Sequence, residues 1–306
     1  MYKKQQEKTK IRDAYLELAD HLFEVGSMFK AMETYRLSLC YSTSSEDVIT
    51  IGIKIGTSAI YVKDFMFGVK FVQDAIMKNN ENPTSLQRTN LLQTLMALIF
   101  VGLGKYEKVC SILWNMSAAN SDEIKHLVSP RDLAWYATIS GIQYYTRQTF
   151  KENKNKACFS LLTEAYEDIQ DLCKSYINFA FDKYFVHLDF FFHEFKSDPI
   201  IGRHMFQLIE QSKKGVMITY ILPYKNVDLR EMATKFGMSL EEVEQAVSGL
   251  IVEGDIKARI DSYNKILHTH GDNYKIWSYE KALQAGEIFL ENLELMLQKH
   301  HLNKHL

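Results

Sequence analysis

The period of the apolar residues changes in the last third of the chain, and this change constrains the fold more than any other feature of the sequence. The apolar residues of segment 229–236 fall on one face of a short helix, and Gly237 follows where a left-handed helix cap is expected. Ser239 and Glu242 form a capping box that predicts the start of a second helix, which Gly254 ends. The sequence therefore predicts two short helices joined by a tight turn.

Beyond this pair of helices the period switches from 3.6 residues to 2. Apolar and charged residues alternate over 256–260, the polar segment 261–265 supplies turn residues, and Ile266 and Leu267 open a second strand. Two helices followed by two strands predict a helix-turn-helix with a β wing, that is, a winged helix, within residues 203–270.

The composition places the chain among ordinary globular proteins. Its 306 residues are 46% hydrophobic and 24% charged, which suffices for two domains with a sizeable core. The net charge of −2 gives no support for a nucleic acid or an anionic membrane attracted by bulk electrostatics. The four cysteines lie far apart without a C-x-x-C pair, and the sequence has no apolar stretch with the length of a membrane span or a signal peptide. We therefore expect a soluble protein of the cytoplasm and nucleus.

A degenerate helical repeat organises the first 130 residues. Small and apolar residues fit the helix-turn-helix pattern of tetratricopeptide repeats three times, with Gly26 and Gly104 at bends between paired helices. The spacing of the repeats is looser than the ~34 residues of a regular array. The small residues of the pattern stand where paired helices touch, so they indicate packing and not chemistry. The fold class that we expect is mainly α, with a right-handed, tetratricopeptide-like solenoid ahead of the winged helix.

The helical pattern continues between the repeats and the winged helix. Residues 149–156 are polar and are predicted to form a loop, and residues 161–176 are predicted to form a helix. Seven large side chains then recur at helical spacing: Phe181, Tyr184, Phe185, Leu188, Phe191, Phe192 and Phe195. Such a stripe could stack nucleic acid bases, but at helical spacing it is more often core, and we expect it to pack between helices.

The last segment, residues 273–306, carries the narrow apolar seam of a helix that needs partner helices. Apolar residues recur in it at steps of three and four residues over about three heptads. The helix either folds back on its own winged helix or joins a bundle of helices from other chains. The second interpretation makes Leu290, Leu293 and Leu297 candidates for subunit contacts.

Tetratricopeptide-like helices followed directly by a winged helix resemble the PCI-domain subunits of the proteasome lid, the COP-nine signalosome and translation initiation factor three. Within this family, segments 220–224, 228–233, 250–262 and 265–267 look most like the signalosome branch, with the lid branch as its nearest relative. The resemblance covers nearly the whole chain and implies four parts: helical repeats (1–130), the helical part of the PCI domain (131–200), its winged helix (201–272) and a C-terminal bundle helix (273–306).

This resemblance implies a non-catalytic scaffold subunit of a complex that removes the ubiquitin-like modifier Nedd-eight from cullins. In the family, winged helices join edge to edge, which makes Arg259, Tyr263 and Ile266 of the wing candidates for subunit contacts. The implied partners are other PCI-domain subunits and, indirectly, cullin-RING ligases, with the proteasome lid as the alternative assembly. Signalosome members of this type usually carry a long segment ahead of the repeats, whereas this sequence starts at the first repeat helix, as a truncation or a lineage difference would explain.

Catalysis is not predicted. His268, His270 and Ser278 match part of the zinc site of the isopeptidases that occur in such complexes, but Lys281 stands where that site needs an aspartate. Two histidines alternating on an exposed strand are the simpler interpretation. The sequence has no Gly-rich phosphate loop, nucleophile elbow or Cys–His signature. We expect no enzyme activity, no metal and no cofactor.

Nucleic-acid binding is the competing function, because winged helices often place their second helix in the major groove of DNA. Here that helix and its end carry Glu241, Glu242, Glu244 and Glu253, with no lysine or arginine from residue 239 to residue 252. Phosphates would be repelled by such a surface. We therefore expect protein partners and no nucleic acid.

Overall fold

The computed structural model describes residues 2–81, 85–116 and 122–269. The chain divides into two compact units, Met1–Lys213 and Lys214–Leu306. In the part of the chain that is described, no helix combines the length and the apolar character needed to cross a membrane. The predicted fold class, a helical solenoid with a winged helix, is confirmed.

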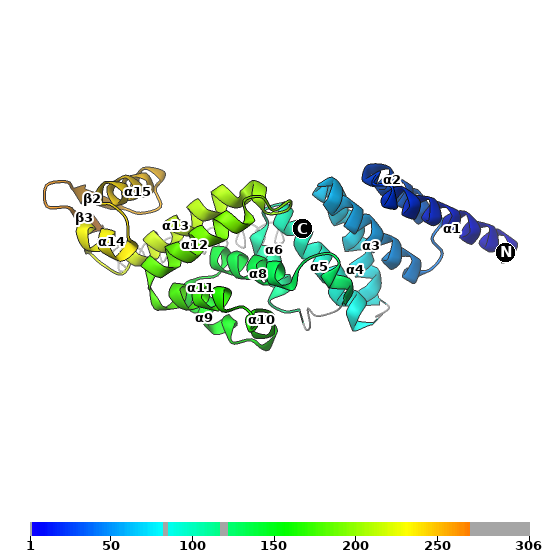
Figure 1. Cartoon of the computed structure of the whole chain (residues 1–306), viewed down its shortest axis with the longest axis horizontal. Helices are drawn as coiled ribbons and strands as arrows, with labels where there is room; N and C mark the ends of the chain where they lie inside the picture. The colour runs from blue at the N-terminus through cyan, green and yellow to red at the C-terminus, as the bar shows by residue number, and fades with distance from the viewer. Residues whose placement is uncertain (1, 82–84, 117–121, 270–306) are drawn as a thin grey trace, which may run out of the picture. The chain divides into compact units, whose positions relative to one another are not determined.

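The first unit begins with a stack of helix pairs (Figure 1). Helices that are consecutive in sequence pack against one another throughout this stack. Gly26 and Gly104 lie in two of the turns with φ angles of 86° and 68°, at the bends that the repeat pattern predicts. The helices are α1 (Tyr2–Glu24), α2 (Met28–Leu39), α3 (Ser45–Val62), α4 (Phe65–Glu81), α5 (Leu86–Gly102) and α6 (Tyr106–Leu113).

Small residues let the helices of the stack approach closely. A Cβ atom at Gly56 of α3 would lie 2.5 Å from Cγ2 of Val72 on α4, so only glycine fits at this crossing. Ala59 and Ala75 are fully buried on the same two helices. The small residues of the repeat pattern therefore act in packing, as predicted.

The first unit continues with shorter helices around an aromatic core. The indole of Trp114 is stacked on Phe159 with ring centroids 4.0 Å apart, and its Nε1 donates to the carbonyl oxygen of Ala137 at 3.0 Å. Trp135 is stacked on Phe191 at 4.9 Å. These elements are α7 (Asp122–Lys125), α8 (Pro130–Tyr144), α9 (Arg147–Lys154), α10 (Ala157–Thr163), α11 (Glu167–Asn178), α12 (Phe181–Phe195), the 3-10 helix η1 (Gly202–His204) and the first part of α13 (Met205–Ile221), whose residues from Lys214 onward belong to the second unit.

The aromatic stripe of α12 is core, as expected. Five of its seven side chains are buried and the other two are half-buried. The side chains that Trp135 contacts, Phe191 and Phe195, belong to this stripe. The stripe thus packs between helices, and its rings are not exposed in a row on which nucleic acid bases could stack.

The prediction of a loop over residues 149–156 is wrong, because most of this segment is helix α9. The hydroxyl of Thr146 caps its first turn by accepting from the backbone N–H of Thr149, and Phe150 is fully buried. The predicted helix over residues 161–176 is in turn interrupted between α10 and α11. A single buried side chain gives too weak a periodic signal to predict a helix of eight residues.

The second unit contains a winged helix. Its elements are β1 (Asn226–Asp228), α14 (Leu229–Phe236), α15 (Leu240–Glu253), β2 (Ala258–Asp261) and β3 (Ile266–Thr269), and the antiparallel sheet has the order β1-β3-β2. Gly237 and Gly254 cap the two helices with φ angles of 63° and 83°, and Ser239 and Glu242 form the predicted capping box. The strand β1 was not predicted from the sequence, and it completes the sheet on the side opposite β2.

Candidate subunit interface

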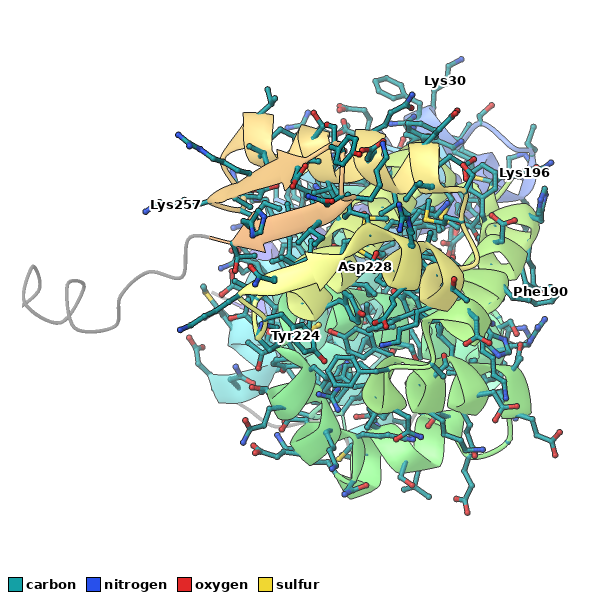
Figure 2. The ribbon with its side chains drawn as sticks, turned by 90° about the vertical axis from the view of Figure 1, so that its left-hand side faces the viewer. Lys30, Phe190, Lys196, Tyr224, Asp228 and Lys257 are labelled. Carbon is teal, nitrogen blue, oxygen red and sulfur yellow. The ribbon has the colours of Figure 1, made fainter. Side chains whose placement is uncertain are left out.

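The strand β2 forms one edge of the sheet. It pairs with β3 on one side only, and among the described residues no strand pairs with its other side. Arg259 lies on this edge strand, opposite His268, and its side chain is exposed. Lys257, just ahead of the strand, projects from the sheet in Figure 2. An open edge can accept a strand from a neighbouring chain, whereas its basic side chains disfavour strands that are not acidic.

The turn of the wing is held by Asp261. Its Oδ1 accepts from the backbone N–H groups of Tyr263 and Asn264 at 3.0 and 3.2 Å, and its Oδ2 accepts from Nδ2 of Asn264 at 2.8 Å. The hydrogen bonds from Asn264 and Tyr263 hold the pKa of Asp261 below its ordinary value. The turn therefore has a defined shape, although the side chain of Tyr263 at its tip is 91% exposed.

An ion pair ties the wing to the second helix. Lys265 has a φ angle of 60°, in the left-handed region, and its Nζ lies 2.9 and 3.0 Å from the two carboxylate oxygens of Glu244 on α15. Both side chains are largely covered. The wing is thus fixed on its own module and presents Tyr263 from a rigid support, which lowers the entropy lost when a partner binds.

Ile266 differs from the other two candidates on the wing. It lies on the central strand β3, where its register partners are Asp228 on one side and Asp261 on the other. Its backbone is therefore flanked by strands on both sides, and its half-buried side chain is the part that a partner can reach. Leu290, Leu293 and Leu297 lie outside the described residues.

Sequence reasoning missed three exposed apolar side chains of the second unit. Leu222 and Tyr224, in the loop ahead of β1, are 69% and 50% exposed, and Val252 near the end of α15 is 84% exposed. The signal that could have marked Leu222 and Tyr224 is their position on either side of a proline, between a helix and a strand. Exposed large apolar side chains that gather in a patch are typical of contact surfaces.

The histidine motif of the wing is only partly described. Nδ1 of His268 lies 2.8 Å from Oδ1 of Asn226, across the pairing of β1 with β3. His270, Ser278 and Lys281 lie outside the described residues. Within the described ranges, no three histidine, cysteine or acidic side chains gather as metal ligands would.

The acidic residues of α15 are in part already paired. Glu244 pairs with Lys265, and both carboxylate oxygens of Glu253 lie within 2.8 Å of Nζ of Lys214. Glu241 and Glu242 are exposed in the first turn of the helix. The face that would enter a DNA groove in other winged helices is therefore negatively charged here.

Comparison with known protein families gives two matches along the chain. Residues 1–153 match the family model described as 26S proteasome subunit RPN7, and residues 183–270 match the PCI domain. The second match covers the aromatic helix α12 and the winged helix. The resemblance to PCI-domain subunits drawn from the sequence is confirmed.

Individual relatives are similar over nearly the whole chain. COP9 signalosome complex subunit 1 of Arabidopsis thaliana is 25% identical over 97% of this chain, and subunit 1b of Drosophila melanogaster is 24% identical over 97%. The 26S proteasome regulatory subunit RPN7 of Saccharomyces cerevisiae is 22% identical over 92%. The chain spans 67%, 57% and 66% of the lengths of these three proteins, respectively.

Proposed function

Because the chain belongs to the 26S proteasome subunit RPN7 family and carries a PCI domain, we propose that it is a non-catalytic scaffold subunit of the COP9 signalosome. This is the complex that deneddylates cullin-RING ubiquitin ligases. The observation that carries the choice of complex is the similarity to signalosome subunit 1 proteins of a plant and an insect over 97% of the chain. We further propose that the protein acts in the cytoplasm and nucleus.

The wing supports assembly through an edge-to-edge contact. A neighbouring PCI subunit would pair with β2, with the basic side chain of Arg259 selecting an acidic strand and Tyr263 filling a pocket of the neighbour. Ile266 would add apolar contact from the face of the sheet. Cullin-RING ligases would be reached indirectly, through the assembled complex.

Purification of the tagged chain from cells, followed by mass spectrometry, tests the choice of complex. Recovery of signalosome subunits together with cullins supports the proposal. Recovery of proteasome lid and base subunits instead would assign the protein to the lid, the alternative that the similarity to RPN7 keeps open.

Substitutions on the wing test the surface. Tyr263→Ala and Arg259→Glu should reduce co-purification of the neighbouring subunit and leave the melting temperature unchanged, because both side chains are exposed. Truncation of an aromatic anchor at the centre of an interface typically costs 2 kcal/mol or more, which is about thirtyfold in affinity. If the neighbouring subunit is fully recovered with both variants, the wing is not part of the interface.

The C-terminal leucines give a second proposed contact, in a helical bundle. A Leu290→Ala/Leu297→Ala variant should fold normally by circular dichroism and drop out of the complex on size exclusion, since each Leu→Ala at a buried seam costs about 2–5 kcal/mol. Loss of thermal stability with intact co-purification would instead place this helix in the protein's own core.

We also propose that the protein has no isopeptidase activity of its own, because Lys281 replaces the acidic ligand of the zinc motif. Incubation of the purified chain with a neddylated cullin tests this. Hydrolysis that is abolished by His268→Ala would contradict the proposal. The acidic face of α15 should likewise make DNA binding weak and lost at moderate salt in an anisotropy titration.

A further inference from the structure

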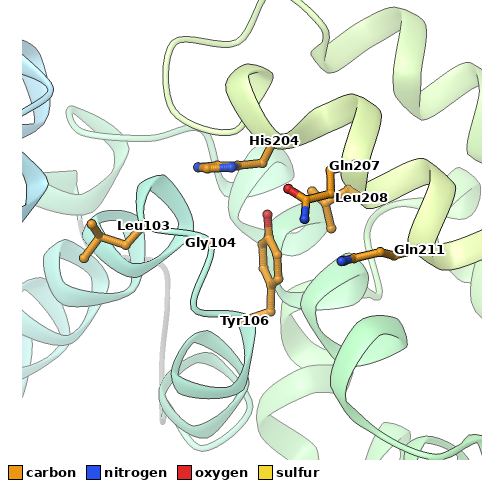
Figure 3. Close-up of a pocket in the computed structure, with 7 residues that line it drawn as sticks. All are labelled: Leu103, Gly104, Tyr106, His204, Gln207, Leu208 and Gln211. Carbon is orange, nitrogen blue, oxygen red and sulfur yellow. The ribbon is translucent and has the colours of Figure 1, made fainter. Parts of the chain in front are cut away.

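A cavity beside the turn between α5 and α6 takes no part in the wing surface. It lies within the first unit, has a volume of about 290 Å³, and is lined by Leu103, Gly104, Tyr106, His204, Gln207, Leu208 and Gln211. Figure 3 shows Tyr106 reaching from the start of α6 toward the side chains of His204 and Gln207, with Gln211 beside it on α13. The volume is near the lower end of the range for ligand sites and far above that of one water molecule.

Three polar side chains of this cavity have no hydrogen-bond partner among the described residues. The hydroxyl oxygen of Tyr106 is buried and has no hydrogen-bond partner among the described residues, and burial raises the pKa of this phenol, which keeps it protonated. Gln207 and Gln211 are exposed, and their side chains make no hydrogen bond within the described part of the chain. A buried hydroxyl without a partner is costly, so a ligand that supplies an acceptor there gains binding free energy.

The residue types define the chemistry of the ligand. Among the described residues, the lining contains no carboxylate, thiol, lysine or arginine. Nε2 of its one histidine, His204, lies 3.0 Å from the carbonyl oxygen of Gly102 and is occupied by that contact. The remaining polar side-chain groups are a phenol, two carboxamides and Nδ1 of His204, which is an acceptor when Nε2 donates to Gly102; together they both donate and accept hydrogen bonds. The complementary ligand is therefore neutral and rich in amide groups, and neither a metal ion nor a phosphate fits this set.

The spacing of the two glutamines matches a polypeptide main chain. Residues four apart on a helix are separated by about 6 Å along its axis. Alternate residues of an extended chain are about 6.6 Å apart, and each presents its N–H and C=O toward the same side. One carboxamide can donate from Nε2 to that C=O and accept at Oε1 from that N–H.

We propose that this cavity binds an extended peptide of a partner protein by its main chain. Gln207 and Gln211 pair with alternate residues of the peptide, and Tyr106 donates to a further carbonyl group. A neighbouring cavity of about 350 Å³ shares Tyr106 and Gln211 with the first and extends the space available to the peptide. Lys105, Lys108 and Glu107 line that extension, and the excess of positive charge favours an acidic side chain at this end of the peptide.

This binding does not rest on the proposed assembly, because every residue involved lies in the first unit. The test starts from a displayed library of random twelve-residue peptides, selected on the full chain. Selected peptides are then synthesised with a fluorophore and titrated by anisotropy. Gln207→Ala/Gln211→Ala should weaken binding by at least about tenfold, since about one hydrogen bond's net free energy is lost at each position.

A matched control and a main-chain probe complete the experiment. Gln73→Ala changes an equally exposed glutamine on α4, outside both cavities, and should leave the affinity unchanged. Tyr106→Phe should weaken binding several-fold without lowering the stability of the free chain, because the lost hydroxyl has no partner there. N-methylation of single peptide amides, measured on the unchanged protein, should abolish binding at two positions that lie two residues apart.

Three results would overturn the proposal. The first is a selection that yields no peptide whose affinity falls in the double glutamine variant. The second is an equal loss of affinity in the Gln73 control. The third is tolerance of N-methylation at every position, which would mean that the side chains of the peptide, and not its main chain, are recognised.

Discussion

Two glycines in the middle of helices should respond in opposite directions to the same substitution by alanine. Gly141 lies in α8, and a Cβ atom built on it would come closer than 3.0 Å to Cζ2 of Trp114 and would lie 3.1 Å from Cε2 of Phe150. Gly249 lies in α15, and a Cβ atom there would have no neighbour within 4 Å. The backbone benefit of alanine is the same in both helices, so packing alone decides the sign.

The magnitudes follow from the surroundings of each site. Overpacking of a core typically costs about 1–3 kcal/mol, and the upper part of that range applies at Gly141 because the indole of Trp114 is held by Phe159 and the carbonyl of Ala137. Exchanging glycine for alanine inside a helix contributes about 1 kcal/mol of stability. Gly141→Ala should therefore lower the free energy of unfolding by about 1–2 kcal/mol, whereas Gly249→Ala should raise it by about 0.4–1 kcal/mol.

Urea unfolding measures both effects. Two of the three tryptophans, Trp114 and Trp135, lie in the first unit, so in a Trp277→Phe background tryptophan fluorescence follows that unit. Far-ultraviolet circular dichroism follows the helices of the whole chain. A urea midpoint that rises in both variants would refute the packing argument. It would mean that the indole of Trp114 moves aside for the new methyl group without a loss of stability.

Two further predictions concern single polar groups. Ser239→Ala removes the acceptor of the capping box of α15 and should lower the free energy of unfolding in urea by about 1 kcal/mol. Ser239→Asp keeps an acceptor at that position and should lower it much less. Equal losses in the two variants would mean that the cap is not the cause. Burial, together with the nearby charges of Asp198 and Glu194, raises the pKa of Asp132, so the folded state binds this proton more tightly than the unfolded state and stability falls as the pH rises through the raised pKa. Asp132→Asn should therefore raise the urea midpoint at pH 7, and the gain should vanish below about pH 3, where the aspartate is protonated in both states. A gain that persists at low pH would point to another cause.

The candidate interface was in part predictable from the sequence. The wing followed from the change of period and from the turn residues, and Arg259 and Tyr263 are exposed on it as such a strand and turn require. The position of Ile266 on the central strand could not be predicted, because it depends on β1. That strand has three residues, of which only Val227 is buried, and it is a strand only because β3 lies beside it.

Local chemistry by itself determined the ends and types of the main elements. Gly237 and Gly254 end helices because a residue without a Cβ atom adopts positive φ at little cost, and the capping box of Ser239 satisfies backbone N–H groups within four residues of chain. The aromatic face of α12 is likewise a periodic signal contained in one segment. Such features need no distant partner, so a pattern of neighbouring residues suffices to predict them.

The tertiary structure decided whatever depends on residues far apart in the chain. Helix α9 forms because Phe150 finds a buried place beside Trp114, which its own polar segment does not reveal. The polar cavity exists because Tyr106 meets Gln207 and Gln211, which follow it by about a hundred positions in the sequence. A local pattern carries no information about such encounters, because the free energy that fixes them comes from packing between elements and not from the preferences of either segment.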